Sequence, residues 1–310
     1  MTTSNQYLLF DDADVDQFPA ESQPEDRPDR IGQAEVEYKP TSTILTPATG
    51  FMDAYDYTLN PYSGCSYGCT YCYAAFFSRD RTKQDSWGYW VSVKENAVKK
   101  MEGIKRPLDD KLIYMSSVTD PYQPIERELK ITRKLLKIMA EGYKPKLVVQ
   151  TRSPDVVRDC DLFHRIKKRG GQVQVNMTVT TDDEDIRRTF EPYCPSNAMR
   201  LRAIEQVQAE GIEACITMTP LLLVKDAEVF CKNLLNTHVK KFIAQPFHFQ
   251  RGRFVAGTSE KAFALMVEKL GCTPSSFRDE YMQHYDETAE VLRKNLPNLG
   301  EGKDGFAPPF

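Results

Sequence analysis

Three cysteines, Cys65, Cys69 and Cys72, lie close together in the run NPYSGCSYGCTYCY (residues 60–73) with the spacing C-x3-C-x2-C. Cysteine thiolates bind zinc ions and iron–sulfur clusters, and zinc sites of this kind use two C-x2-C pairs to supply four ligands. The chain has no second pair, since its other five cysteines lie at least sixteen residues apart. Three thiolates therefore indicate a site with one open coordination position, as in a [4Fe–4S] cluster in which one iron has no protein ligand. The alternatives are a partial zinc site and three buried structural cysteines.

The composition is that of a soluble globular protein. Of the 310 residues, 41% are apolar and 27% are charged, which is enough to bury a core. The sequence shows no long apolar run and no signal peptide, and eight mostly scattered cysteines do not resemble a disulfide framework, so we expect a cytoplasmic protein without a membrane partner. The net charge of −3 is uneven, since residues 1–30 carry eight acidic and two basic residues. The nearly neutral remainder neither requires nor excludes a nucleic-acid partner.

Strand-like and helix-like segments alternate after about residue 50. Short apolar or β-branched runs predict strands at 56–62, 111–118, 146–151, 172–180, 213–223 and 240–249. Apolar residues at helical spacing, several followed by a glycine stop, predict helices at 91–104, 126–142, 156–171, 196–211, 227–239 and 259–270. One or two further helices are expected within residues 273–296.

This alternation predicts an α/β fold with a parallel sheet and outer helices. Six units are too few for a closed eight-fold barrel, so we expect a partial (β/α)6 barrel of the TIM type with a C-terminal helical extension; a doubly wound sheet is the alternative. In both folds the chemistry lies at the carboxyl ends of the strands, and the cysteine run follows the first strand. The expected organisation is an acidic, disordered tail over 1–40, a barrel core over 41–255 and C-terminal helices over 256–310.

The cysteine spacing, its place after the first strand and the barrel pattern together resemble the radical S-adenosylmethionine superfamily. Further stretches resemble the spore photoproduct lyase branch of that superfamily, in matching order: 41–74, 116–136, 148–163, 175–212 and 217–226. The resemblance implies a [4Fe–4S] cluster on Cys65, Cys69 and Cys72, whose open iron is chelated by S-adenosylmethionine. It further implies that an electron, from a reductant such as flavodoxin or ferredoxin, yields a 5′-deoxyadenosyl radical that abstracts hydrogen from a substrate.

The resemblance also implies roles for single residues. Tyr71 and Tyr73 match tyrosines that flank the third cysteine of the lyase and are assigned there to a radical relay; aromatic packing over the cluster is an equal alternative. Thr119 and Asp120 match a Ser-Asp pair at the end of the second strand, near the bound S-adenosylmethionine. Arg152 falls where the lyase has a lysine that contacts the same cofactor, and arginine keeps the charge with a different geometry.

Four further polar residues belong to the fourth strand and the segment after it. Asn176 and Thr178 end the strand and are expected to face the cavity, where polar side chains suit the ribose and methionine parts of S-adenosylmethionine. Glu191 and Arg200 match the E-P…R pattern of the family. This pair either holds the methionine carboxylate or stabilises a loop as an ion pair.

Ser117 departs from the lyase, which has a cysteine at this position whose thiol returns hydrogen to the product radical. Because an alcohol O–H bond is much stronger than a thiol S–H bond, serine cannot supply a hydrogen atom in that way. Cys194, after the fourth strand, is the scattered cysteine expected nearest the cavity, although a buried structural role is the simpler interpretation. We therefore favour a small-molecule or peptide substrate; the alternatives are nucleic-acid repair or modification and a non-catalytic cluster-binding regulator.

Overall fold

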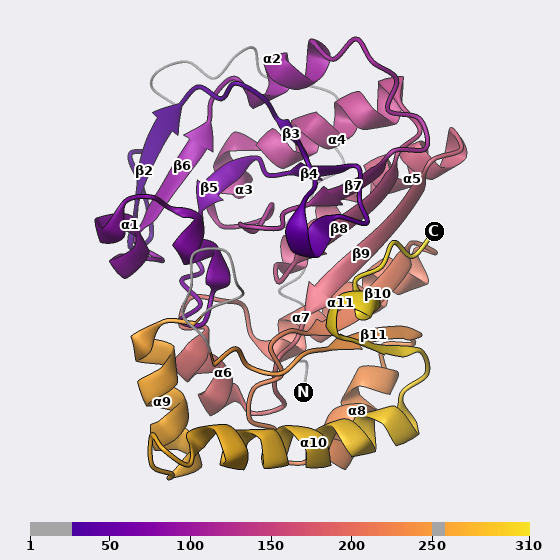
Figure 1. Ribbon diagram of the computed structural model, residues 1–310. Coiled ribbons are helices and arrows are strands. Elements are labelled where there is room, and N and C mark those ends of the chain that lie inside the picture. The colour runs from indigo at the N-terminus through magenta and orange to yellow at the C-terminus, as the bar shows by residue number, and fades with distance from the viewer. Residues whose placement is uncertain (1–26, 250–257) are drawn as a thin grey trace, which may run out of the picture.

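The computed structural model describes residues 27–249 and 258–310. Its main element is an eight-stranded sheet of order β12-β11-β10-β9-β8-β7-β4-β3 (Figure 1). The bounds are Leu45–Pro47 (β3), Tyr57–Leu59 (β4), Leu112–Met115 (β7), Lys146–Thr151 (β8), Gln172–Thr178 (β9), Glu213–Met218 (β10), Lys241–Ala244 (β11) and Leu299–Glu301 (β12). Every pair from β4 to β12 is parallel, and β3 is antiparallel to β4. The six predicted strands thus form the predicted partial barrel, with β12 and β3 added at its edges.

Helices cover the outer face of this sheet because their apolar residues recur on one side. The helices that follow strands are α4 (Ile131–Gly142), α5 (Cys160–Lys168), α7 (Asn197–Ala209) and α8 (Ala227–Leu235). In α4, Ile131, Leu135 and Met139 are spaced one turn apart and are buried. Successive strand residues point to opposite faces, so Met177 of β9 packs into the core that contains α7 while Asn176 points to the inside of the barrel.

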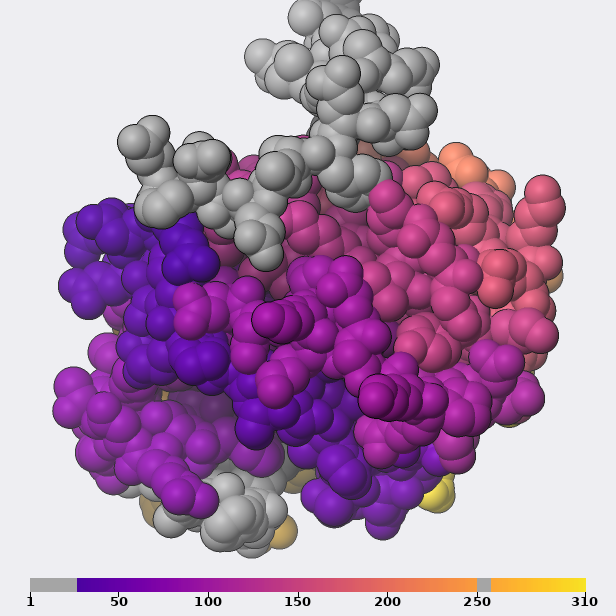
Figure 2. All heavy atoms as spheres, turned by 90° about the horizontal axis from the view of Figure 1, so that it is seen from above, coloured from indigo at the N-terminus to yellow at the C-terminus, as the bar shows by residue number. Residues whose placement is uncertain are grey.

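A second sheet of order β1-β2-β6-β5 stands beside the barrel. Its bounds are Arg30–Ile31 (β1), Ala34–Lys39 (β2), Tyr62–Gly64 (β5) and Trp90–Lys94 (β6). Because β5 ends directly before Cys65, this sheet fixes the start of the cysteine loop. Helix α2 (Ala97–Glu102) follows β6. Figure 2 shows the indigo, purple and magenta segments of the N-terminal part packed against the pink segments that follow them in the chain.

Two predictions about this part of the chain are wrong. The predicted tail extends through residue 40, but residues 34–39 form β2, in which Ala34 and Val36 are buried on alternate positions. The predicted helix over 91–104 begins as strand β6, and α2 starts only at Ala97. Residues 91–104 begin with the alternation of a strand and continue with the spacing of a helix. Because the helical spacing dominates the pattern, it predicts one helix over the whole run. Residues 1–26 of the predicted tail lie outside the described residues.

The predicted helix over 126–142 is divided into α3 (Ile125–Leu129) and α4. Lys130 has a φ of +51°, which ends α3. The buried carboxylate of Glu126 accepts hydrogen bonds from the backbone N–H groups of Thr132 (2.9 Å) and Arg133 (3.2 Å). This carboxylate thus caps the free N–H groups at the start of α4.

The predicted C-terminal helices are α9 (Glu260–Leu270) and α10 (Phe277–Asn295). The buried hydroxyl of Tyr281 in α10 donates to the backbone oxygen of Leu221 (2.5 Å) and accepts from the backbone N–H of Phe247 (2.7 Å). These bonds attach α10 to the segments that follow β10 and β11. None of the described helices is long and apolar enough to cross a membrane.

Beyond α10 the chain forms β12 and a short helix, α11 (Gly302–Gly305), which the sequence analysis missed. Lys303 forms an ion pair with Asp53 (2.7 Å), and the ring of Phe306 packs edge-on against Phe51. The segment after β12, at one edge of the sheet, therefore contacts the segment after β3, at the other edge.

Gly64→Ala is expected to destabilise the fold more than Gly50→Ala. Both glycines have positive φ, but a Cβ on Gly64 would lie 2.6 Å from the ring and backbone oxygen of Trp90, whereas Gly50 has no neighbour within 4 Å. The left-handed conformation costs roughly 1–2 kcal/mol in either variant, and overpacking adds about 1–3 kcal/mol for Gly64 alone. Urea denaturation measures both free energies of unfolding. Equal losses of the free energy of unfolding in the two variants would show that Trp90 of β6 does not restrict the side chain at position 64.

Candidate active site

The cysteine loop, residues 65–72, lies at the carboxyl ends of the barrel strands, as predicted. The backbone N–H of Ser66 donates to Oε1 of Gln123 (2.9 Å), in the segment after β7. The backbone N–H of Thr70 donates to the carbonyl oxygen of Phe190 (2.8 Å), the last residue of α6 (Glu184–Phe190). The loop is therefore bound on both sides by segments that follow strands.

Backbone amides point at two of the three loop sulfurs. Burial raises the pKa of Cys65 well above its usual value and that of Cys72 to about 12, while backbone N–H groups act in the opposite direction. These groups belong to Tyr67 for Cys65 and to Ala74 and Ala75 for Cys72. N–H groups directed at buried sulfurs stabilise metal-bound thiolates and tune the metal.

The donor set fits an iron–sulfur cluster better than a single zinc ion. All eight cysteines are free thiols. Within residues 27–249 and 258–310, no three side chains of the ligating types converge on a point that one ion could occupy. In a cubane cluster each thiolate binds a different iron, so three cysteines on one loop need not converge on one point.

Arg152, directly after β8, joins the loop to the rest of the site. Its Nη1 donates to Sγ of Cys69 (3.0 Å), to the hydroxyl oxygen of Tyr71 (2.9 Å) and to Oε1 of Glu191 (3.1 Å). The hydroxyl of Tyr71 also donates to Glu191. Four residues that the sequence analysis singled out thus meet in one cluster of contacts, which we call the Arg152 network.

Glu191 is fully buried at the centre of the Arg152 network. Its carboxylate also accepts hydrogen bonds from Nη2 of Arg200 and from the hydroxyl of Thr180 (2.8 Å). Burial by itself raises the pKa of Glu191, but the charges of Arg200 and Arg152 outweigh it and hold the pKa at about 2. Arg200, equally buried, donates to the carbonyl oxygen of Thr178 (3.2 Å) and so ties the network to the end of β9.

Asp120 and Thr119 bind the backbone of their neighbours. The carboxylate of Asp120 accepts hydrogen bonds from the hydroxyl of Thr151 (2.7 Å) and from the backbone N–H groups of Arg152 (2.8 Å) and Tyr122 (2.9 Å). Burial raises the pKa of Asp120 against the effect of these donors. The hydroxyl of Thr119 donates to the last carbonyl oxygen of β5 (2.7 Å).

Ser117 lies in the segment after β7 and contacts Tyr73, another predicted site residue. The hydroxyl of Tyr73 donates to the carbonyl oxygen of Ser117, and Nδ2 of Asn60 lies 3.4 Å from the Ser117 hydroxyl. The preceding residue, Ser116, is buried with a φ of +71°, and its hydroxyl has no hydrogen-bond partner in the described part of the chain. A buried hydroxyl without a partner at a strand end fits a site that accepts a polar ligand.

Asn176 and Thr178 lie on the inner face of the barrel and bond to neighbouring strand residues. The hydroxyl of Thr178 accepts from Nε2 of Gln150 (2.8 Å) and lies 3.1 Å from that of Thr217. Oδ1 of Asn176 accepts from Nε2 of Gln174 (2.8 Å). The hydrogen bonds of these two side chains therefore join them to strand residues rather than to the Arg152 network.

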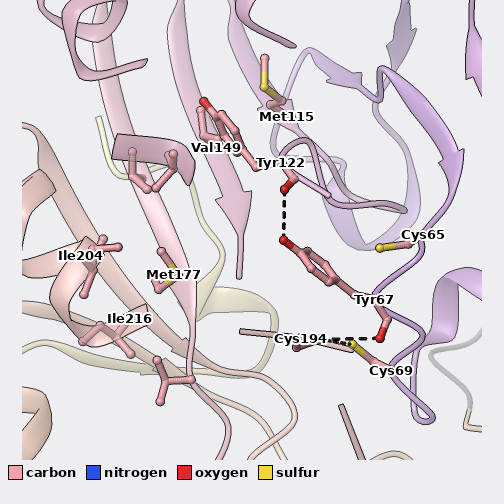
Figure 3. Packing of buried hydrophobic residues seen from close by; sticks show 14 of the residues in the cluster. Cys65, Tyr67, Cys69, Met115, Tyr122, Val149, Met177, Cys194, Ile204 and Ile216 are labelled. Atoms are coloured by element: carbon pink, nitrogen blue, oxygen red, sulfur yellow. Dashed lines mark hydrogen bonds between the residues drawn. The ribbon is translucent and has the colours of Figure 1, made fainter. Parts of the chain in front are cut away.

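The structure brings Cys194 directly to the cysteine loop (Figure 3). Its Sγ lies 3.5 Å from Sγ of Cys69 and 3.8 Å from the carbonyl oxygen of Tyr67. Both sulfurs are buried. The expectation that Cys194 lies near the site is confirmed by this contact.

Sequence reasoning missed three polar residues that hold the site. Gln123 bonds to the cysteine loop, Asn60 bonds to Ser117, and Nζ of Lys94 donates to the carbonyl oxygen of Asn60 (2.6 Å). Burial lowers the pKa of Lys94 to about 8. Asn60 directly follows β4, Gln123 lies in the segment after β7, and each precedes a proline. Polar residues beside such prolines are the signal that could have found them.

Glu191→Gln is expected to lower the free energy of unfolding at neutral pH by about 3–5 kcal/mol, because two buried guanidinium groups lose their counter-charge. Since the folded pKa of about 2 lies below the ordinary 4.5, the carboxylate's contribution is complete above about pH 4.5 and is lost as the pH falls toward 2. Wild type should lose about 3 kcal/mol more than the variant over this interval. Urea denaturation at each pH measures this. Glu205→Gln, exposed on α7, should show the same change in the free energy of unfolding with pH as wild type. If Glu191→Gln also shows the wild-type change with pH, the assignment is contradicted.

Comparisons with known proteins agree with this geometry. The family model of the radical SAM superfamily matches residues 59–230. An uncharacterised protein of Methanocaldococcus jannaschii is 36% identical over 166 residues, which cover 54% of this chain and 60% of that protein. An uncharacterised protein of Mycobacterium tuberculosis is 29% identical over 173 residues, which cover 54% of this chain and 49% of that protein. The matches therefore span about half the length of these curated relatives.

Solved structures show the same fold. A variant of spore photoproduct lyase matches with a TM-score of 0.59 at 14% identity, over 86% of this chain and 81% of that chain. Spore photoproduct lyase complexed with dinucleoside spore photoproduct matches with a TM-score of 0.57 over the same shares. The family match covers more than half of the chain and includes Cys65, Cys69 and Cys72. The chain therefore belongs to the radical SAM superfamily.

Proposed function

We propose that the protein abstracts a hydrogen atom from a small-molecule or peptide substrate. The observation that carries the proposal is the contact between the cysteine loop and Arg152 at the carboxyl ends of the barrel strands. A [4Fe–4S] cluster on Cys65, Cys69 and Cys72, with S-adenosylmethionine on its open iron and an electron from flavodoxin or ferredoxin, supplies the 5′-deoxyadenosyl radical when bound.

The Arg152 network holds the residues that would meet the cofactor. Arg152 contacts Cys69 directly, so its guanidinium would lie beside a cluster bound to Cys69 and would attract the carboxylate of S-adenosylmethionine. Glu191 already binds two guanidinium groups and is fully buried. We therefore assign Glu191 and Arg200 to holding the loop and orienting Arg152, in preference to binding the methionine carboxylate. Tyr71, bonded to both Arg152 and Glu191, is held in one orientation beside the loop.

Polar groups surround the proposed S-adenosylmethionine position. Thr119 and Asp120 follow β7, and Asn176 and Thr178 lie in β9. The unpaired hydroxyl of Ser116 adds a donor at the same strand end, where a bound polar group would remove the cost of burying it unpaired. These groups bind by hydrogen bonds and exclude water from the site.

Ser117 supports a reaction other than that of spore photoproduct lyase. Tyr73 and Asn60 contact Ser117, so it belongs to the same strand-end cluster as the cysteine loop. Its hydroxyl cannot return a hydrogen atom to a carbon radical as a thiol can. The product radical therefore does not receive a hydrogen atom from Ser117.

Replacing Cys65, Cys69 and Cys72 together by alanine is expected to abolish iron binding and 5′-deoxyadenosine formation, because the cluster loses every protein ligand. Anaerobic reconstitution followed by iron analysis and chromatography of the reduced protein with S-adenosylmethionine measures both. Cys160→Ala, buried on α5, should bind iron like wild type.

Iron binding by the triple variant would disprove the site. If wild type binds four irons but yields no 5′-deoxyadenosine with any candidate substrate, the enzymatic proposal fails and a non-catalytic cluster-binding regulator replaces it.

Nucleic-acid repair or modification is the second candidate. It is favoured by the likeness to spore photoproduct lyase, which was solved with dinucleoside spore photoproduct. We expect duplex DNA to bind weakly and to leave 5′-deoxyadenosine formation unchanged. Fluorescence anisotropy at several salt concentrations measures the binding. Affinity that falls steeply with salt, together with stimulation of 5′-deoxyadenosine formation by DNA, would favour the nucleic-acid function instead.

A further inference from the structure

We propose that Cys69 and Cys194 are a thiol-oxidation site: in the cluster-free protein they form a reversible disulfide, which prevents the cluster from being inserted. The disulfide itself depends only on the contact between the two sulfurs. Its effect on the cluster rests on the proposed function of Cys69 as an iron ligand.

The two sulfurs are already close enough for a small movement to join them. They lie 3.5 Å apart, and a disulfide bond is about 2.05 Å long, so they must approach by about 1.5 Å. Both cysteines belong to segments outside helices and strands, which adjust more easily than a sheet. A backbone hydrogen bond from Thr70 to Phe190 (2.8 Å) already joins these two segments one residue beyond Cys69.

The remaining scattered cysteines offer no comparable pair. The sulfurs of three of them contact backbone oxygens at 3.8–4.0 Å: Cys215 with Ile216, Cys231 with Val291 and Cys272 with Val267. Within residues 27–249 and 258–310, the sulfur–sulfur contact of Cys69 and Cys194 is therefore distinctive.

The disulfide and the cluster compete for one sulfur. Cys69 can donate its thiolate to iron or share its sulfur with Cys194, and it cannot do both. Once Cys69 is bonded to Cys194, the loop retains two thiols, Cys65 and Cys72, where the cluster requires three.

Hydrogen peroxide is a sufficient oxidant, since it accepts the two electrons that a disulfide releases. One thiol reduces peroxide to water and becomes a sulfenic acid. The second thiol attacks that sulfur, the S–S bond forms, the S–O bond breaks and a second water leaves. The two sulfurs supply two electrons and the two thiols supply two protons. Added thiol reverses the bond by exchange.

The first test treats cluster-free wild-type protein with hydrogen peroxide, removes the peroxide and maps peptides by mass spectrometry. We expect a Cys69–Cys194 crosslink, a loss of two hydrogens from the intact mass, and reversal by a thiol reductant. Cys160→Ala, matched in burial, should form the same crosslink, and Cys194→Ala should not. Absence of the crosslink in wild type overturns the proposal.

The second test treats the peroxide-oxidised proteins with arsenite, which reduces sulfenic acids and leaves disulfides intact, and then measures the iron bound on anaerobic reconstitution without thiol reductant. Wild type and Cys160→Ala should bind at least about fivefold less iron than their untreated forms, and Cys194→Ala should keep its capacity. An equal loss in Cys194→Ala overturns the blocking role. Cys194→Ser serves if circular dichroism shows the alanine variant unfolded. Failure of untreated wild type to bind iron would instead contradict the proposed function, and the crosslink test would still stand.

Discussion

The buried carboxylate of Glu191 balances two guanidinium groups at the end of the barrel, and most of the site depends on this balance. Each of these charges alone would cost several kcal/mol to bury, so the three stabilise one another only as a set. Arg152 also donates hydrogen bonds to Cys69 and Tyr71, and Arg200 donates one to the carbonyl oxygen of Thr178 at the end of β9. Three separate segments of the chain are thus fixed relative to the cysteine loop by one group of charges.

The cysteine loop is held differently on its other side. There the contacts are neutral: β5 precedes the loop, Gln123 accepts from its backbone, and Thr119 bonds to the residue before Cys65. Neutral hydrogen bonds set the path of the backbone, while the charged network sets the electrostatic environment of Cys69. This division separates the shape of the loop from the potential in which its sulfurs lie.

The sequence allowed the chemistry and the barrel to be predicted further than the supports of the site. Cysteine spacing and β-branched runs are strong local signals, so the loop and six strands could be identified. The small sheet could not, because β5 has three residues and β6 merges into a helical pattern. Asn60 and Gln123 are single neutral residues that belong to no spaced sequence motif. Glu191 and Arg200 were predicted as a pair, but only their complete burial favours a role in holding the loop.

The ion pair between Lys303 and Asp53 joins residues 250 positions apart in the sequence. On the ribosome, Asp53 is made long before Lys303. The segment that follows the edge strand β3 therefore has no contact with the α11 segment until the end of translation. At roughly 5–20 residues per second, translation of the intervening chain takes on the order of 10–50 s. During that time an open strand edge is exposed to other nascent chains, and pairing with them leads to aggregation. Until residues 303–306 are made, the segment after β3 thus lacks the two side-chain contacts that join the edges of the sheet.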